Sequence, residues 1–218
     1  MVDERRIAAA ALVVAPGLFL LSNLLHPTEL ATGNEPEQLA AIADDYQRWQ
    51  AAHAISLASL MVFALAVAGL ALLVARSNAR TARAGGALGL AGLIGLGGAL
   101  AIDGFAWGIA GEVWGKSDAP GKLVAETVLD DMQHSEWALM FYLTGVLWIL
   151  GMMLLSLGAA RAGLVPMWAA ALLILGTIMV GLETSIHSNV YFVIAAAVLL
   201  AGGIAMALHL REPPEVAA

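Results

Sequence analysis

The sequence predicts an all-α protein, a polytopic transmembrane six-helix bundle that occupies residues 1–218 as a single transmembrane domain. The first observation is the composition: 61% of the residues are hydrophobic and 12% are charged, whereas soluble domains carry about a quarter charged residues. The second observation is that the apolar residues form separate stretches of about 20, the length of a membrane span. Lipid offers no partner to unpaired backbone groups, so we expect these stretches to be helical.

The six predicted spans lie at approximately residues 7–25, 52–75, 85–111, 136–160, 165–185 and 189–210. The first stretch is too long for a signal-peptide core and lacks a small-residue cleavage pattern, so we expect it to be retained. The third span contains many glycines, and Gly85 and Gly89 have the spacing at which helices pack closely in lipid. We therefore expect the third span to lie at the centre of the bundle.

The links between spans alternate in charge, which predicts the topology. One set of ends and links holds seven of the ten basic residues, namely Arg5, Arg6, Arg76, Arg80, Arg83, Arg161 and Arg211. The links at about 26–51 and 112–135 hold the other three and are rich in acidic residues. Because cytoplasmic links carry the excess of Lys and Arg, we expect cytoplasmic termini in a bacterial cytoplasmic (inner) membrane.

The first outer link predicts an amphipathic helix on the outer membrane surface. Asn34 is a typical N-cap, Pro36 lies in the first turn, and Glu37 follows at the capping-box position. The apolar stripe of this helix consists of Leu39, Ile42, Tyr46 and Trp49. The second outer link predicts a weaker helix beginning at Asp118. Its apolar side consists of Leu123, Val124, Val128 and Met132.

Ionisable groups within spans are costly, so each is a candidate functional residue. Asp103 lies deepest, in the third span, and Glu183 lies near the outer end of the fifth. Four of the five histidines also lie near the outer side, each at a different span end. They are His26, His53, His134 and His187.

Helical spacing places several of these residues on shared faces. The pairs four residues apart are Ser22 with His26 and Glu183 with His187. The longer stripes are Trp49, His53 and Ser56 in the second span, and Asp103, Trp107 and Trp114 in the third. We therefore expect a pocket open to the outer face. Its candidate ligand-binding residues are Asp103, Glu183, His53, Ser22 and Trp107. Capping, solvated or structural roles remain open for each polar residue, and an interfacial belt is the favoured role of the tryptophans.

The residue types in this group are compatible with a transition metal, with haem, or with a small cationic or lipidic ligand. Imidazole and carboxylate suit zinc, copper or iron. The candidate metal ligands are His26, His53, Asp103, Glu183 and His187. For a b-type haem, the axial ligands would be His53 and one of His26, His134 or His187.

The motifs Ser22-x-x-x-His26 and Glu183-x-x-x-His187, with the intramembrane Asp103, loosely resemble the pattern of the ceramidase-like intramembrane hydrolases. The resemblance implies a metal that activates water against a lipid amide or ester. This chain departs from that family because it has six predicted spans instead of seven. It also has Glu183 where the family has a histidine.

Two further classes stay open, so whether the protein is an enzyme is undecided. In a proton-coupled transporter, Asp103 and Glu183 would relay protons, although the inner halves of the spans are almost purely apolar. In a non-catalytic subunit or scaffold, the glycine-rich span would contact a membrane-protein partner or a second copy. The whole chain resembles uncharacterised six-span bacterial integral membrane proteins. The lipid bilayer is the expected partner, and the acidic outer links argue against nucleic acid. The chain has no cysteine, which excludes thiolate chemistry.

Overall fold

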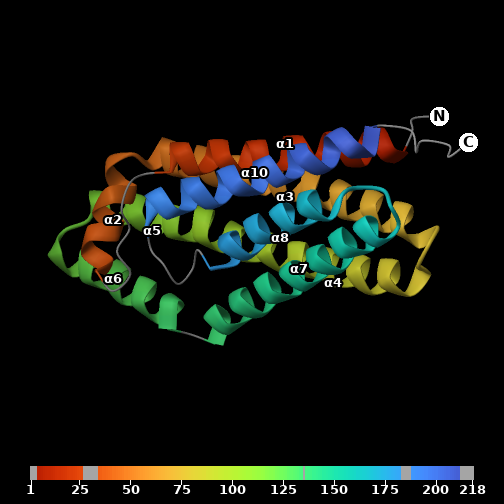
Figure 1. The fold of residues 1–218 in the computed structure, drawn as a ribbon. Helices are drawn as coiled ribbons and strands as arrows, with labels where there is room; N and C mark the ends of the chain where they lie inside the picture. Colours follow the sequence, from red (N-terminus) through yellow and green to blue (C-terminus); the bar gives the residue numbers. More distant parts are fainter. Residues whose placement is uncertain (1–3, 27–33, 135, 183–187, 212–218) are drawn as a thin grey trace, which may run out of the picture.

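The computed structural model describes residues 4–26, 34–134, 136–182 and 188–211, and Figure 1 shows a bundle of helices in these residues. This confirms the predicted all-α class. The elements are α1 (Glu4–Leu25), α2 (Glu35–Asp44), α3 (Tyr46–Ala75), α4 (Ala79–Ala101), the π-helical turn η1 (Ile102–Trp107), α5 (Gly108–Lys116), α6 (Ala119–His134), α7 (Glu136–Arg161), α8 (Met167–Gly181) and α10 (Asn189–Arg211).

Within the described residues, five helices are long and apolar enough to cross a membrane. They are α1, α3, the continuous helix of α4, η1 and α5, α7, and α10. The chain is therefore a multi-pass membrane protein. The predicted fifth span corresponds to α8, an apolar helix of 15 residues, and the part of that span from residue 183 onwards lies outside the described residues. The sixth crossing thus stays a prediction.

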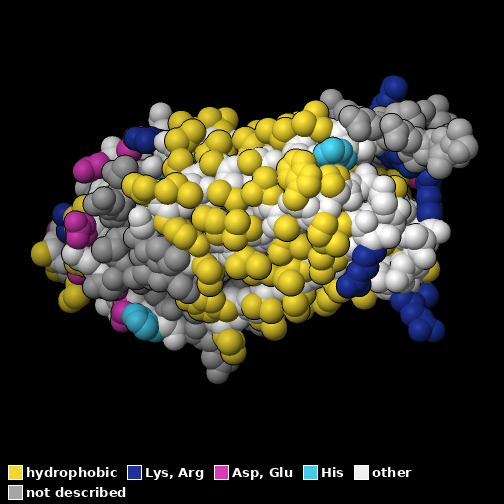
Figure 2. Space-filling view, viewed as in Figure 1, with side chains coloured by type: hydrophobic (Ala, Val, Ile, Leu, Met, Phe, Trp, Pro, Cys, Tyr) yellow, Lys and Arg dark blue, Asp and Glu magenta, His cyan; other side chains and the backbone are white. Residues whose placement is uncertain are grey.

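Charged side chains gather at the two ends of the bundle and leave an apolar band between them. Figure 2 shows Lys and Arg mainly at the end where α1 begins and α10 ends, and acidic side chains at the end formed by α2, α5 and α6. At the basic end, Arg76 donates to Glu4 across 2.6 Å and joins the end of α3 to the start of α1. An apolar band between two charged ends is the pattern that lipid requires.

The glycines of α4 bring this helix close to α7, as their spacing predicts. A Cβ atom added to Gly92 would lie 2.7 Å from both the Thr144 carbonyl oxygen and the Trp148 Cα. One added to Gly85 would lie 2.9 Å from the Leu155 side chain. α4 also packs against α3, while α1 lies between α3 and α10. The close packing that the glycine spacing predicts is therefore present, with α7 as the principal partner. The expected central position is wrong, because in the described residues α4 packs mainly against α3 and α7.

At the acidic end, α2, α5 and α6 form an outer layer that covers the bundle (Figure 1). The Asn34 side chain caps α2 by accepting from the Glu37 amide at 3.4 Å, which confirms the predicted helix start. The predicted placement of its apolar stripe on the membrane surface is wrong. Leu39 and Ile42 are fully buried, because glycines of α5 such as Gly111 leave room for α2 to pack there.

The predicted helix of the second outer link is present as α6, but its buried face differs from the prediction. Leu123 and Val124 are 63% and 64% exposed, and Val128 is 46% exposed. Ala125 and Leu129 instead pack with Leu39 of α2. The face nearest α2 and α5 is thus buried, although it is not the face with the most apolar side chains.

Candidate functional site

The site lies at the π-helical turn η1, where the long helix of α4 and α5 meets the outer part of α3. Gly104 is buried in this turn, and a Cβ atom there would lie 2.7 Å from the His53 Cγ. Glycine therefore lets the backbone of η1 lie directly against the imidazole ring. π-Helical turns within α-helices occur frequently at functional sites, and Asp103 lies in this one.

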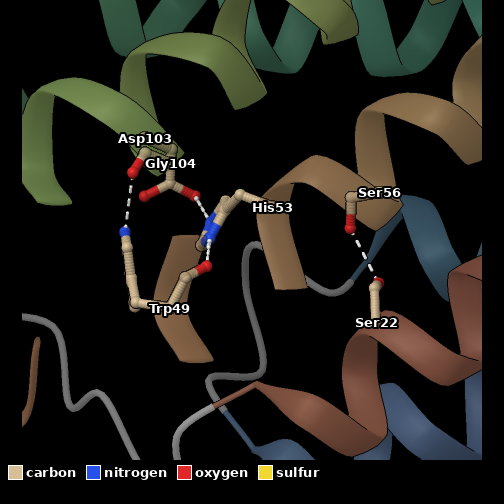
Figure 3. Close-up of polar contacts among 6 residues, drawn as sticks. All are labelled: Ser22, Trp49, His53, Ser56, Asp103 and Gly104. Atoms are coloured by element: carbon tan, nitrogen blue, oxygen red, sulfur yellow. Dashed lines mark hydrogen bonds and ion pairs between the residues drawn. The ribbon is translucent and has the colours of Figure 1, made fainter. Parts of the chain in front are cut away.

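His53 and Asp103 form the central polar contact of the site. The His53 Nε2 lies 3.2 Å from the Asp103 Oδ2, and the His53 Nδ1 lies 2.9 Å from the Trp49 carbonyl oxygen (Figure 3). The His53 side chain is 3% exposed and the Asp103 side chain 28% exposed. Both ring nitrogens of the buried imidazole therefore have partners, while the Asp103 side chain is partly exposed although its Oδ1 is buried.

Trp49 links α3 to η1 by a hydrogen bond beside this contact. Its indole Nε1 donates to the Gly104 carbonyl oxygen at 2.9 Å, and its ring is almost completely buried. The His26 ring at the end of α1 lies 4.9 Å from the Trp49 ring and 5.2 Å from the His53 ring, measured between centroids. The rings of Trp49 and His26 thus both lie close to the His53 imidazole.

A second polar contact joins α1 to α3 one turn further along α3. The Ser22 and Ser56 hydroxyl groups lie 2.7 Å apart (Figure 3). Ser22 also donates to the Phe19 carbonyl oxygen at 2.9 Å. Both serines are buried, at 2% and 8% exposure. The structure therefore brings Ser22, His26, His53 and Asp103 to one end of the bundle, as helical spacing and topology predict.

Two polar atoms on consecutive turns of the long helix are buried without a hydrogen-bond partner among the described residues. They are the Asp103 Oδ1, an acceptor, and the Trp107 Nε1, a donor. A buried polar atom without a partner costs about 1–3 kcal/mol, so such atoms are uncommon. Two more lie on α7, at Trp148 and Ser156.

The proposed metal and haem ligands are only partly assembled. Within the described part of the chain, no three His, Asp or Glu side chains are arranged to hold a metal ion. Glu183 and His187 lie outside the described residues, so their part in a metal site stays a prediction. A metal or haem iron at the His53 Nε2 would have to displace Asp103, which already contacts that nitrogen.

His134 is not part of the buried cluster. It lies at the end of α6 with its side chain 71% exposed, and its Nδ1 lies 3.0 Å from the Asp130 carbonyl oxygen and 2.9 Å from the Asp130 carboxylate. The hydrogen bond to that carbonyl, the Asp130 charge and the more distant Glu35 charge raise the pKa of His134 above 6.5. These contacts give His134 a local role on α6.

Trp49 is the site residue whose role the sequence analysis missed. We expected the tryptophans to form an interfacial belt, but Trp49 is 1% exposed and donates to the neighbouring helix. Trp114 likewise donates to Glu126 at 2.9 Å. The available signal was the i, i+4 spacing of Trp49 and His53, which places the indole and the imidazole on one face of α3.

The fold and this cluster define a class, a multi-pass helical membrane protein with a buried polar site at one end of its bundle. Comparison with models of known protein families, with curated proteins and with solved structures finds no match to this chain.

Proposed function

We propose that this protein resides in a bacterial cytoplasmic membrane, with six spans and cytoplasmic termini, and binds a small or lipidic ligand at its outer end. The observation that carries the proposal is the buried His53–Asp103 pair. Ionisable groups are rarely placed inside spans without a functional reason. Here polar groups from α1, α3 and η1 meet at one end of the bundle, and two buried polar atoms of the long helix lack hydrogen-bond partners among the described residues.

The depth of Asp103 supports a ligand drawn from the lipid boundary. Twenty residues separate Arg83 from Asp103 along one continuous helix. At about 1.5 Å per residue this distance is about 30 Å, the thickness of the hydrocarbon core. With Arg83 near the inner boundary, Asp103 lies in the outer part of the hydrocarbon core, close to the level at which lipid head groups begin.

The two unpartnered atoms define the chemistry that the ligand should offer. The Asp103 Oδ1 accepts a hydrogen bond and the Trp107 Nε1 donates one. A hydroxyl or amide group provides both a donor and an acceptor, and such groups occur where lipid chains join their head groups. We therefore favour a lipid with a hydroxyl or amide at that position over a metal ion, because both His53 ring nitrogens already have partners.

The test is native mass spectrometry of the full chain extracted from its own membrane in mild detergent. We expect a bound small molecule or lipid on the wild-type protein, and a reduction on the order of tenfold in the Asp103→Asn variant. Asp118→Asn removes an exposed carboxylate at the start of α6 and serves as the matched control, which should keep the adduct.

Two outcomes would count against this proposal. Equal occupancy of the adduct in all three proteins, or no adduct on any of them, would contradict the proposed ligand site. Elemental analysis of the same samples tests the metal hypothesis. A transition metal at one per chain that disappears in Asp103→Asn would replace the lipid version with the metal version.

A second candidate, a non-catalytic membrane subunit, is favoured by the surface of α6. Leu123, Val124 and Val128 are exposed on a helix of the outer layer. Exposed apolar groups that adjoin one another often mark contacts with another protein. A partner of constant stoichiometry that copurifies with the wild type and is lost in Val124→Glu would support this function, whereas a monomer in both would contradict it.

A further inference from the structure

The His53–Asp103 pair can be assigned its protons from the groups around it. The His53 Nδ1 faces the Trp49 carbonyl oxygen at 2.9 Å, and a carbonyl oxygen only accepts hydrogen bonds. The Nδ1 therefore carries a hydrogen atom and donates. The state of the other ring nitrogen, Nε2, is then the only variable on the imidazole.

The contact between the His53 Nε2 and the Asp103 Oδ2, at 3.2 Å, needs one proton between the two atoms. Either a protonated carboxyl group donates to the neutral ring, or the protonated ring donates to the carboxylate. Both arrangements leave the pair with zero net charge and hold one proton in common. If that proton leaves, the lone pair of the Nε2 faces a carboxylate, and the two atoms repel each other.

From this geometry we propose that His53 and Asp103 together form a binding site for one exchangeable proton, and that release of this proton separates the two side chains. The proposal deepens the ligand site and rests on it for its biological role. Of the two groups, Asp103 lies nearer to solvent, because its side chain is 28% exposed while that of His53 is 3% exposed, although the Asp103 Oδ1 is buried; we therefore expect the proton to exchange on the Asp103 side of the pair. Exchange takes place on the side of the membrane where Asp103 lies.

Separation of the His53 and Asp103 side chains affects the rest of the site through Trp49, which contacts both His53 and η1. Trp49 holds the imidazole through its carbonyl oxygen and holds η1 through its indole, which donates to Gly104. Movement of Asp103 therefore changes the position of the turn that also carries Trp107. Among the described residues, His26 of α1 is the other titratable group whose ring meets His53. Ser22 and Ser56, one turn further along α3, are neutral.

The test is a pH titration of the full chain in lipid vesicles, followed by infrared difference spectroscopy. The signal of the Asp103 carboxyl group is identified by its loss in Asp103→Asn, and the imidazole signal of His53 by its loss in His53→Gln. We expect both signals to change in one step with a common midpoint. The wild type should release about one proton per chain in that step, whereas in Asp103→Asn the His53 signal should change at a different midpoint, because the carboxyl group that shares the proton is gone.

Two controls separate this proton site from a merely structural contact. Asp103→Glu keeps a carboxyl group and should retain the common step, whereas His26→Gln should retain it with a shifted midpoint. Midpoints of Asp103 and His53 that differ by more than about one pH unit would overturn the proposal. So would a His53 titration that is unchanged in Asp103→Asn. If the common step is present while mass spectrometry shows no ligand, the ligand proposal fails and the proton site stands.

Discussion

The two parts of the single long helix formed by α4, η1 and α5 contact their neighbours in different ways. In α4, glycines bring the backbone against α7, and the contacts are apolar and close. In η1, the backbone turn widens, and indole, imidazole and carboxyl groups link it to α3. Close packing at small residues stabilises a bundle in lipid. Burying polar groups costs free energy that apolar packing does not, so the polar part at the acidic end of the bundle is the better candidate for a functional role.

The largest effect is expected from a bulky side chain at the glycine contact between α4 and α7. We expect Gly92→Leu to lower the free energy of unfolding by about 3 kcal/mol, because the new side chain meets backbone atoms of Thr144 and Trp148 that are unable to move aside. Unfolding in mixed micelles measures this effect. Gly98→Leu, at an exposed position with no atom within 4 Å of an added Cβ, should change stability little. Equal losses in the two variants would contradict the α4–α7 packing.

A smaller effect is expected at the polar part, from Trp49→Phe. This change removes the donor to the Gly104 carbonyl oxygen and should cost about 1–2 kcal/mol beyond the loss of ring volume. Trp148→Phe is the matched control, because Trp148 is 3% exposed and its Nε1 has no partner among the described residues. If both substitutions cost the same in mixed micelles, the bond to Gly104 contributes nothing.

The Ser22–Ser56 contact should contribute less again. In a double-mutant cycle of Ser22→Ala and Ser56→Ala, we expect a coupling energy of about 0.5–1 kcal/mol, since two neutral hydroxyl groups share one hydrogen bond. Ser59→Ala provides the reference pair with Ser22→Ala. Its hydroxyl donates to the Ala15 carbonyl oxygen at 2.8 Å and not to Ser22. These two changes should be additive, and a coupling equal to that of the first pair would show that the cycle reports general loosening.

The sequence predicts the glycine-packed part of the long helix better than the polar part. Gly85 and Gly89 have a spacing with a direct physical meaning in lipid, and the structure places them against α7. The meeting of His53 with Asp103 also follows, because the predicted order of the spans places both at the same end of the bundle and each lies on a helix face with other polar or aromatic residues. These features depend on local spacing and on span order, which a sequence contains.

Two features are not predicted by local sequence patterns. They are the π-helical turn and the faces of the outer-layer helices that become buried. Residues 102–107 contain no local pattern that predicts a π-helical turn, and the turn becomes visible only in the contacts that Gly104 makes with α3. On α6, Leu129 is buried while Val124 is exposed, because the positions of α2 and α5 select the face. The hydrophobicity of a side chain indicates how favourable its burial is, but it does not indicate which helix face will meet a neighbouring helix.

Outside the bundle, His134 offers a comparison with the buried pair, because its partner is the Asp130 of its own helix. We expect its pKa in the folded protein to lie above 6.5, owing to the Asp130 carbonyl oxygen, the Asp130 carboxylate and the Glu35 charge. Because the folded protein then binds this proton more tightly than the unfolded chain, the associated stability is present below pH 6.5. It is lost as the pH rises through the raised pKa. The exposed position makes it small.

Proton NMR of the His134 ring measures this pKa directly. Asp130→Asn should lower the value only in part, because the backbone carbonyl oxygen remains as an acceptor and Glu35 keeps its charge. Asp131→Asn removes another exposed carboxylate that is no part of this contact, and it should shift the value less. If the two variants shift the pKa equally, general surface charge is responsible. His134 would then not be an example of a histidine controlled by a partner in its own helix, to be compared with His53 and its partner Asp103 in another helix.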